Sequence, residues 1–108
     1  MKSLSRESDF MNKNLKIMLV EDESLNSMFM IDYLKLCGYQ NIDCAVSGKQ
    51  AMSFIEVNQP DIILMDIRLI GDMDGIETAE LIQEKYKINI IFVTGYNESS
   101  IREKAEKL

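Results

Sequence analysis

The chain has 108 residues, 46% hydrophobic and 28% charged. That is enough apolar material for one domain with a single core, and a composition unlike that of a disordered chain. Eighteen acidic and twelve basic residues give a net charge of -6, which disfavours nucleic acid as the main partner because its binding depends on a basic surface. Histidine is absent, which excludes His-based triads, His-containing zinc sites and a phosphohistidine on this chain.

The remaining composition indicates a cytoplasmic protein without membrane contact. No apolar stretch approaches the ~20 residues that a membrane span needs, and residues 1–14 lack the apolar centre of a signal peptide. Cys37 and Cys44 follow no zinc or redox spacing, so we expect buried free thiols.

The first half of the chain alternates between strand and helix patterns. Residues 1–13 are polar and without periodicity, which predicts a flexible arm ahead of a domain over 14–108. Residues 15–20 form an apolar run typical of a strand buried on both faces. Residues 24–37 predict a helix that ends at Gly38. The more polar residues 40–46 predict a second strand, near an edge of the sheet.

The alternation continues through the second half. Ser47 and Gln50 have the spacing of a capping box at the start of a helix, and Pro60 closes that unit. Residues 61–66 predict a third apolar strand. Asp74 and Glu77 cap a helix whose expected buried stripe is Ile76, Ala79, Ile82 and Tyr86. Residues 88–94 predict a fourth strand, and a last helix begins near Asn97, with Ile101, Ala105 and Leu108 on one face. The fold class is therefore α/β, a doubly wound parallel sheet with helices on both faces.

Polar residues gather where three of these strands end. The first strand leads into Glu21 and Asp22, the third ends on Asp66, and the fourth ends on Thr94 and Gly95. In open parallel sheets the carboxyl ends of the strands form the ligand site. Carboxylates crowded there suit Mg²⁺, which takes oxygen ligands. The Thr94 hydroxyl and the Gly95 amide can bind phosphoryl oxygens, and a carboxylate beside the metal can act as a nucleophile.

Each of these signals has a plainer interpretation when taken alone. The acids of residues 21–23 also suit the N-terminus of a helix, where its dipole favours negative charge. Asp66 also suits a turn or a cap, and Thr94-Gly95 also suits a simple strand-to-turn step. Their occurrence at three separate strand ends, in this chain order, favours a functional site.

Four stretches together resemble the receiver domain of two-component response regulators. They are residues 17–23, 61–67, 73–77 and 90–95, and the resemblance runs from about Leu15 to Leu108. It implies a flavodoxin-like receiver fold that acts as a signalling switch. It does not imply an enzyme beyond catalysis of its own phosphorylation and slow dephosphorylation.

The resemblance implies a role for each matching residue. Asp66 corresponds to the phosphoacceptor and a metal ligand, and Asp22 to the acid that binds Mg²⁺ directly. Glu21 corresponds to its neighbour, which usually acts through water, and Arg68 to the residue whose backbone carbonyl completes the metal site.

The implied mechanism is phosphoryl transfer from a sensor histidine kinase to Asp66. Thr94 corresponds to the switch hydroxyl that moves to the phosphoryl group, and the Gly95 amide to a group that helps to hold it. The added charge of about -1.5 to -2 is then expected to change a protein-interaction surface, for a downstream protein or for self-association.

The sequence departs from the family pattern in two places. The fifth strand with its lysine, and the fifth helix, are lacking, and neither Lys104 nor Lys107 is assigned the lysine's role. The loop of residues 68–72 is one residue longer than the common form and lacks its usual proline. We therefore expect a fragment or truncated form of a longer protein, with self-association of a short form as the alternative. Without its neighbours the fourth strand is an open edge, and the first helix, apolar over much of its circumference, expects burial on more than one side.

Two other functions are compatible with this kind of sheet. A pseudo-receiver keeps the fold and binds partners without phosphate signalling, which the missing lysine favours and the intact Asp22, Asp66 and Thr94 oppose. A Mg²⁺-dependent phosphohydrolase needs a second acid just after its nucleophile, and Arg68 stands in that place.

Overall fold

The computed structural model describes residues 14–93 of the chain. Four parallel strands form one sheet: β1 (Ile17–Val20), β2 (Ile42–Ala45), β3 (Ile62–Asp66) and β4 (Asn89–Val93). Three helices connect them: α2 (Ser24–Leu36), α3 (Gly48–Val57) and α4 (Gly75–Lys85). The strand order is β2-β1-β3-β4, so the chain reverses its direction of winding between β1 and β3. This is the doubly wound parallel sheet that the alternation of elements predicts.

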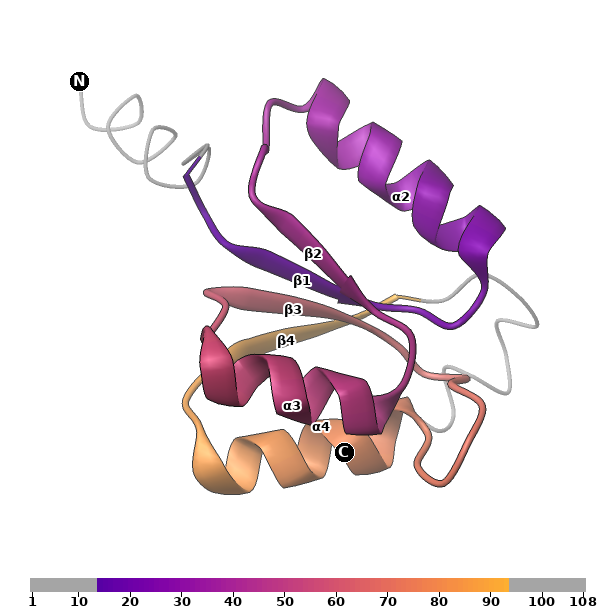
Figure 1. Cartoon of the computed structure of the whole chain (residues 1–108), viewed down its shortest axis with the longest axis vertical. Coiled ribbons are helices and arrows are strands. Elements are labelled where there is room, and N and C mark those ends of the chain that lie inside the picture. The colour runs from indigo at the N-terminus through magenta and orange to yellow at the C-terminus, as the bar shows by residue number, and fades with distance from the viewer. Residues whose placement is uncertain (1–13, 94–108) are drawn as a thin grey trace.

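The helices cover both faces of the sheet (Figure 1). Helix α2 lies on one face, and α3 and α4 lie side by side on the other. The main core fills the space between the sheet and α3 and α4. It contains Met18, Val20, Ala45, Ala51, Ile55, Ile63, Met65, Leu69, Ile82 and Ile88. Side chains of a strand alternate between faces, so Met18 and Val20 of β1 enter this core and Ile17 and Leu19 face α2.

Burial of the strands follows their place in the sheet. All four residues of β1, a central strand, are buried. β2 lies at an edge and is mostly half-buried or exposed, as its more polar sequence predicts. β4 is the other edge strand within residues 14–93, and Asn89 and Ile91 on it are exposed. Within residues 14–93, β4 is therefore less buried than its apolar sequence predicts.

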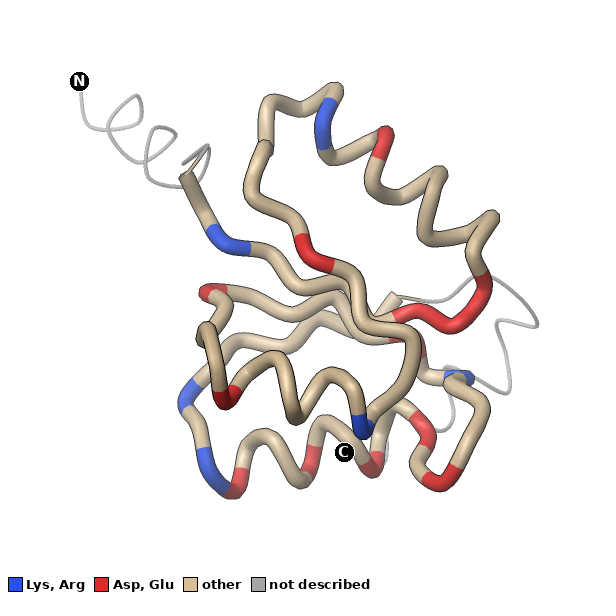
Figure 2. Tube along the Cα trace, viewed as in Figure 1, with Lys and Arg blue, Asp and Glu red and all other residues tan. Residues whose placement is uncertain are grey.

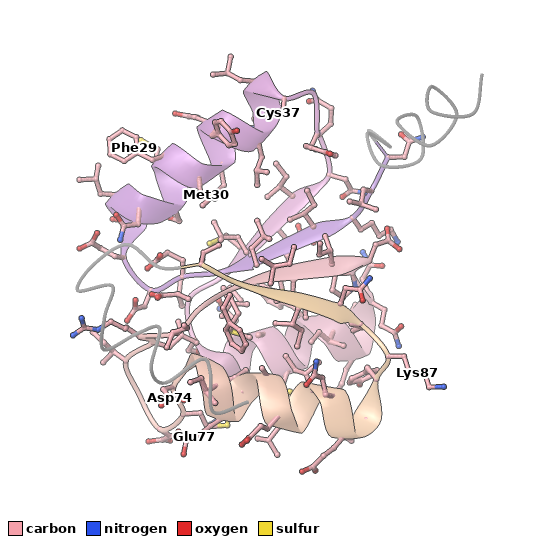
Figure 3. All side chains as sticks on the ribbon, turned by 180° about the vertical axis from the view of Figure 1, so that it is seen from behind. Phe29, Met30, Cys37, Asp74, Glu77 and Lys87 are labelled. Carbon is pink, nitrogen blue, oxygen red and sulfur yellow. The ribbon has the colours of Figure 1, made fainter. Side chains whose placement is uncertain are left out.

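The predicted helix starts are present. The Ser47 side chain accepts a hydrogen bond from Gln50 N at 3.0 Å, but the Gln50 side chain accepts from Val46 N rather than from Ser47 N, so this box is not reciprocal. Asp74 and Glu77 form a complete capping box, each side chain accepting from the backbone N–H of the other (Figure 3).

The burial of the cysteines and of the α4 stripe differs from the prediction. Cys37 and Cys44 are free thiols but half-buried rather than buried. Ile76 and Tyr86 are half-buried, and the fully buried position that the α4 stripe omits is Thr78. Thr78 is polar, but its hydroxyl donates to Asp74 O at 2.7 Å, which allows its burial. The arm over residues 1–13 and the helix expected after Asn97 lie outside the described residues.

Helix α2 is less buried than its apolar sequence predicts. Within the described part of the chain Leu34 is its one buried residue. The exposed large side chains on it are Leu25, Met28, Phe29, Tyr33 and Leu36, and Phe29 points away from the sheet in Figure 3. An apolar pocket of about 350 Å³ on the same side is lined by residues that include Leu34, Leu64 and Ile91. This face of the sheet is therefore only partly covered by residues 14–93.

Candidate metal and phosphoryl site

The strand register brings the acids together. Val20 of β1 pairs with Met65 of β3. The next residues of the two segments are Glu21, which directly follows β1, and Asp66, which ends β3, so both lie at the same edge of the sheet. Glu21 continues the pairing of β1 with β2, because its N–H donates to Ala45 O at 2.9 Å. The carboxyl edge of the sheet thus receives an acid from each of its two central strands.

Three carboxylates meet at this edge. One oxygen from each of Glu21, Asp22 and Asp66 lies within 4.8 Å of the others. Glu21 and Asp66 are 8% and 6% exposed, and Asp22 is half-buried. In Figure 2 the acidic segment appears where β1 leads into α2. The structure therefore brings together two of the three predicted strand ends, those that carry Glu21, Asp22 and Asp66.

A backbone N–H holds one oxygen of each carboxylate. Glu23 N donates to Glu21 Oε2 at 3.0 Å, and Arg68 N donates to Asp66 Oδ1 at 3.0 Å. Ile70 N donates to Asp22 Oδ2 at 2.9 Å, across 48 positions of sequence. Three side chains of like charge are thereby oriented by main-chain donors.

The crowding raises the proton affinity of Glu21. Burial raises the pKa of Glu21 to about 7 against the hydrogen bond from Glu23 N, and the neighbouring carboxyls of Asp66 and Asp22 act in the same direction as burial. A buried carboxylate with like charges beside it is unfavourable unless it binds a proton or a cation. A divalent cation would relieve this unfavourable charge. The three carboxylates, two of them buried, supply the hard oxygen ligands that Mg²⁺ prefers.

The carboxylates line an open cavity of about 390 Å³. Its walls are Glu21, Asp22, Glu23, Asp66, Arg68 and Ile70. Arg68 and Ile70 are exposed and belong to the loop that joins β3 to α4. The cavity has room for a hydrated cation and a phosphoryl group beside Asp66.

Gly75 holds α4 against this edge. A methyl group on Gly75 would overlap the carbonyl of Asp66, and Gly75 N donates to Ile67 O at 3.0 Å. The start of α4 therefore packs directly on the backbone of the phosphoacceptor candidate. Only glycine allows this close approach.

The predicted site residues divide into two groups. Glu21, Asp22, Asp66 and Arg68 come together around the cavity. Thr94 and Gly95 lie outside the described residues, and β4 is described up to Val93, which pairs with Asp66. The Ile70 N–H could not be predicted as a partner of Asp22, because the identity of a side chain does not show where the backbone N–H of a loop residue points.

Comparison with known proteins identifies the family. Residues 17–108 match the response regulator receiver domain. The transcriptional regulatory protein PdtaR of Mycobacterium tuberculosis is 29% identical over 90 residues, which are 83% of this chain and 43% of that protein. A protein-glutamate methylesterase/protein-glutamine glutaminase of Archaeoglobus fulgidus is 29% identical over 94 residues, 87% of this chain and 27% of that protein.

A solved structure agrees with the sequence relatives. The N-terminal domain of a response regulator/sensory box/GGDEF three-domain protein from Carboxydothermus hydrogenoformans superposes with a TM-score of 0.71 at 33% identity. The match covers 82% of this chain and 74% of that one.

The doubly wound sheet with acids at its carboxyl edge is the architecture of a receiver domain, a signalling module. The chain belongs to the response regulator receiver domain family. It spans less than half the length of the curated relatives that it matches. Among residues 14–93 none of the helices has the length and apolar character to cross a bilayer.

Proposed function

We propose that this protein is a phosphoacceptor receiver, which takes a phosphoryl group from a sensor histidine kinase onto Asp66 with Mg²⁺ and changes a protein-interaction surface. The observation that carries the proposal is the group of three carboxylates at the carboxyl edge of the sheet. Asp66 is buried at the base of a cavity and oriented by Arg68 N–H, the arrangement that a positioned nucleophile requires. We further propose a cytoplasmic location and a domain over residues 14–108.

In the proposed reaction an Asp66 carboxylate oxygen attacks the phosphorus of the donor. The bond from phosphorus to the donor nitrogen breaks as the bond from phosphorus to Asp66 forms, and the donor imidazole keeps the electron pair and takes up a proton. Arg68 N donates to Asp66 Oδ1, which orients the carboxylate for the attack. Glu21, Asp22, Asp66 and the Arg68 carbonyl would hold Mg²⁺, which supplies neutralisation of the charge on the transferring group.

Signalling requires a group that responds to the negative charge of the phosphoryl group on Asp66. The resemblance assigns this role to Thr94, with the Gly95 amide as a second donor. Their sequence position supports the assignment, because Thr94 directly follows Val93 and Val93 pairs with Asp66. A hydroxyl drawn to the phosphoryl group then biases a two-state surface near β4, which a downstream protein or a second copy recognises.

Intact-mass spectrometry after incubation with Mg²⁺ and acetyl phosphate tests the proposal. The wild type and Asp72→Asn should each gain the mass of one phosphoryl group, and Asp66→Asn should gain none. Asp72 is the matched control because it is an exposed acid in the same loop. A folded wild type that gains no mass, or an Asp66→Asn variant that gains as much as the wild type, would overturn the proposal.

The pseudo-receiver is the alternative that a negative result would favour. The same assay on folded protein separates the two functions, because a pseudo-receiver binds its partners without acquiring the phosphoryl group.

A further inference from the structure

We propose that the backbone N–H of Ile70 is a positioning group for the metal site, which holds the Asp22 carboxylate in its ligand orientation and thereby couples the β3–α4 loop to cation binding. This inference rests on the proposed function, because it concerns the same three carboxylates. Its basis is the 2.9 Å hydrogen bond from Ile70 N to Asp22 Oδ2.

Asp22 is the member of the group that most needs such a partner. Glu21 and Asp66 are buried and are oriented by N–H groups two residues further along the chain. Asp22 is half-buried, and its N–H partner comes from a different segment of the fold. A less enclosed carboxylate loses more conformational entropy when it binds a metal. A hydrogen bond that already fixes its orientation therefore lowers this entropy cost more than it would for a buried carboxylate.

The hydrogen bond does not compete with a cation. A carboxylate has about four lone-pair sites on two oxygens. One N–H on Oδ2 leaves Oδ1, and a further site on Oδ2, for a metal. Outer-shell donors of this kind orient ligands and typically change metal affinity by about 10-fold to 100-fold when they are lost.

The loop is shaped to present this N–H. Leu69 is buried in the core, while the neighbouring Ile70 side chain is 78% exposed, so packing of Ile70 does not explain its position. Gly71 has φ = 119°, a conformation that residues with a Cβ rarely adopt. A Cβ on Gly71 would meet nothing within 4 Å. Glycine is therefore needed at position 71 for its positive φ angle, and not because a side chain there would lack space.

Thermodynamic linkage makes the effect reciprocal. If the ordered loop favours cation binding, the cation must favour the ordered loop by the same factor. Mg²⁺ should therefore slow hydrogen exchange at the Ile70 amide, although the residue is exposed. This readout needs neither a phosphodonor nor phosphorylation.

The test measures the Mg²⁺ dissociation constant by calorimetry for the wild type, Ile70→Pro and Ile70→Ala. Proline removes the N–H, and alanine removes the exposed side chain but keeps the donor. We expect Ile70→Pro to bind Mg²⁺ about 10-fold more weakly or worse, and alanine to rescue the affinity. Gly71→Ala, which disfavours the loop conformation without a clash, should weaken binding in the same direction. Circular dichroism establishes that each variant is folded.

The possible results distinguish failure of this inference from failure of the proposed phosphoacceptor function. Wild-type binding with equal affinity in Ile70→Pro and Ile70→Ala overturns the inference and leaves the proposed function standing. Equal weakening in both variants also overturns it, because the side chain would then be responsible. A wild type that binds no Mg²⁺ overturns both proposals. In the wild type, hydrogen exchange at Ile70 that is fast and insensitive to Mg²⁺ counts against the coupling independently of the variants.

Discussion

Gly48, at the start of α3, lies directly against Thr78 of α4: a methyl group in place of its hydrogen would overlap the Thr78 hydroxyl oxygen. Thr78 is completely buried, and its hydroxyl donates to Asp74 O, so it cannot turn away without losing that bond. This contact sets how closely the two helices pack beneath the sheet. It also links the start of α3 to the capping residue of α4.

Gly48→Ala should therefore destabilise the fold. The gain in helix propensity is about 1 kcal/mol, but overpacking of a buried contact typically costs about 1–3 kcal/mol, and this overlap is severe. We expect a net loss of about 1–2 kcal/mol in urea unfolding. In a double-mutant cycle with Thr78→Ala, the combined loss should be smaller than the sum of the single losses. Strict additivity would show that the two residues do not contact each other as described.

Gly75→Ala should cost more, and no side-chain change should rescue it. The methyl group would overlap the backbone carbonyl of Asp66, which cannot move without shifting the end of β3. We expect a loss above that of Gly48→Ala in the same urea assay, together with reduced phosphorylation of Asp66 in any folded fraction. Glu80→Gly, at an exposed position of the same helix, is the control for helix propensity alone. A Gly75→Ala variant as stable as the wild type would contradict the close approach.

Without divalent cations, stability should fall as the pH rises. Burial raises the pKa of Glu21 from 4.5 to about 7, so the folded protein holds this proton where the unfolded chain has lost it. The stabilisation is fully present below about pH 4.5 and disappears as the pH passes through about 7, a change of the order of 3 kcal/mol. Urea unfolding in chelator across this range measures it. Glu21→Gln should flatten the slope, and an unchanged slope in that variant would assign the effect to other groups.

Mg²⁺ should remove this penalty. A ligand that binds the folded state alone stabilises it by RT ln(1 + [L]/Kd), and the cation competes with the proton on Glu21. Millimolar Mg²⁺ should raise the Tm more at about pH 8 than at about pH 5. Asp22→Asn should lose most of the increment, whereas Asp43→Asn on the exposed part of β2 should keep it. An equal increment in the two variants would place the cation elsewhere.

The exposed face of α2 should contribute little to stability within the described fold. Leu34 is buried, so Leu34→Ala should cost about 2–5 kcal/mol. Phe29 is 65% exposed, so Phe29→Ser should change the free energy of unfolding by less than about 0.5 kcal/mol. A loss for Phe29→Ser as large as that for Leu34→Ala would show that this face is covered in solution, and sedimentation at several concentrations would then reveal whether a second copy covers it.

Much of this fold follows from patterns that are local in sequence. The apolar runs before Glu21 and Asp66 specify strands, and the Asp74–Glu77 capping box specifies the start of α4, because a few neighbouring residues satisfy the hydrogen bonds involved. The alternation of elements then determines that the strands are parallel and that their carboxyl ends share one edge. The three acids of the site follow from that rule.

The tertiary structure decided what depends on distances between segments. The raised pKa of Glu21 needs the burial and the charges that the register of β1 and β3 creates. The Ile70–Asp22 hydrogen bond joins residues 48 positions apart through a backbone group, which no side-chain pattern marks. The exposure of Phe29 depends on which segments pack against α2, and the apolar sequence of the helix does not specify them. Sequence periodicity specifies which face of an element is apolar, whereas packing of the whole chain determines whether that face is buried and which backbone donors reach the site.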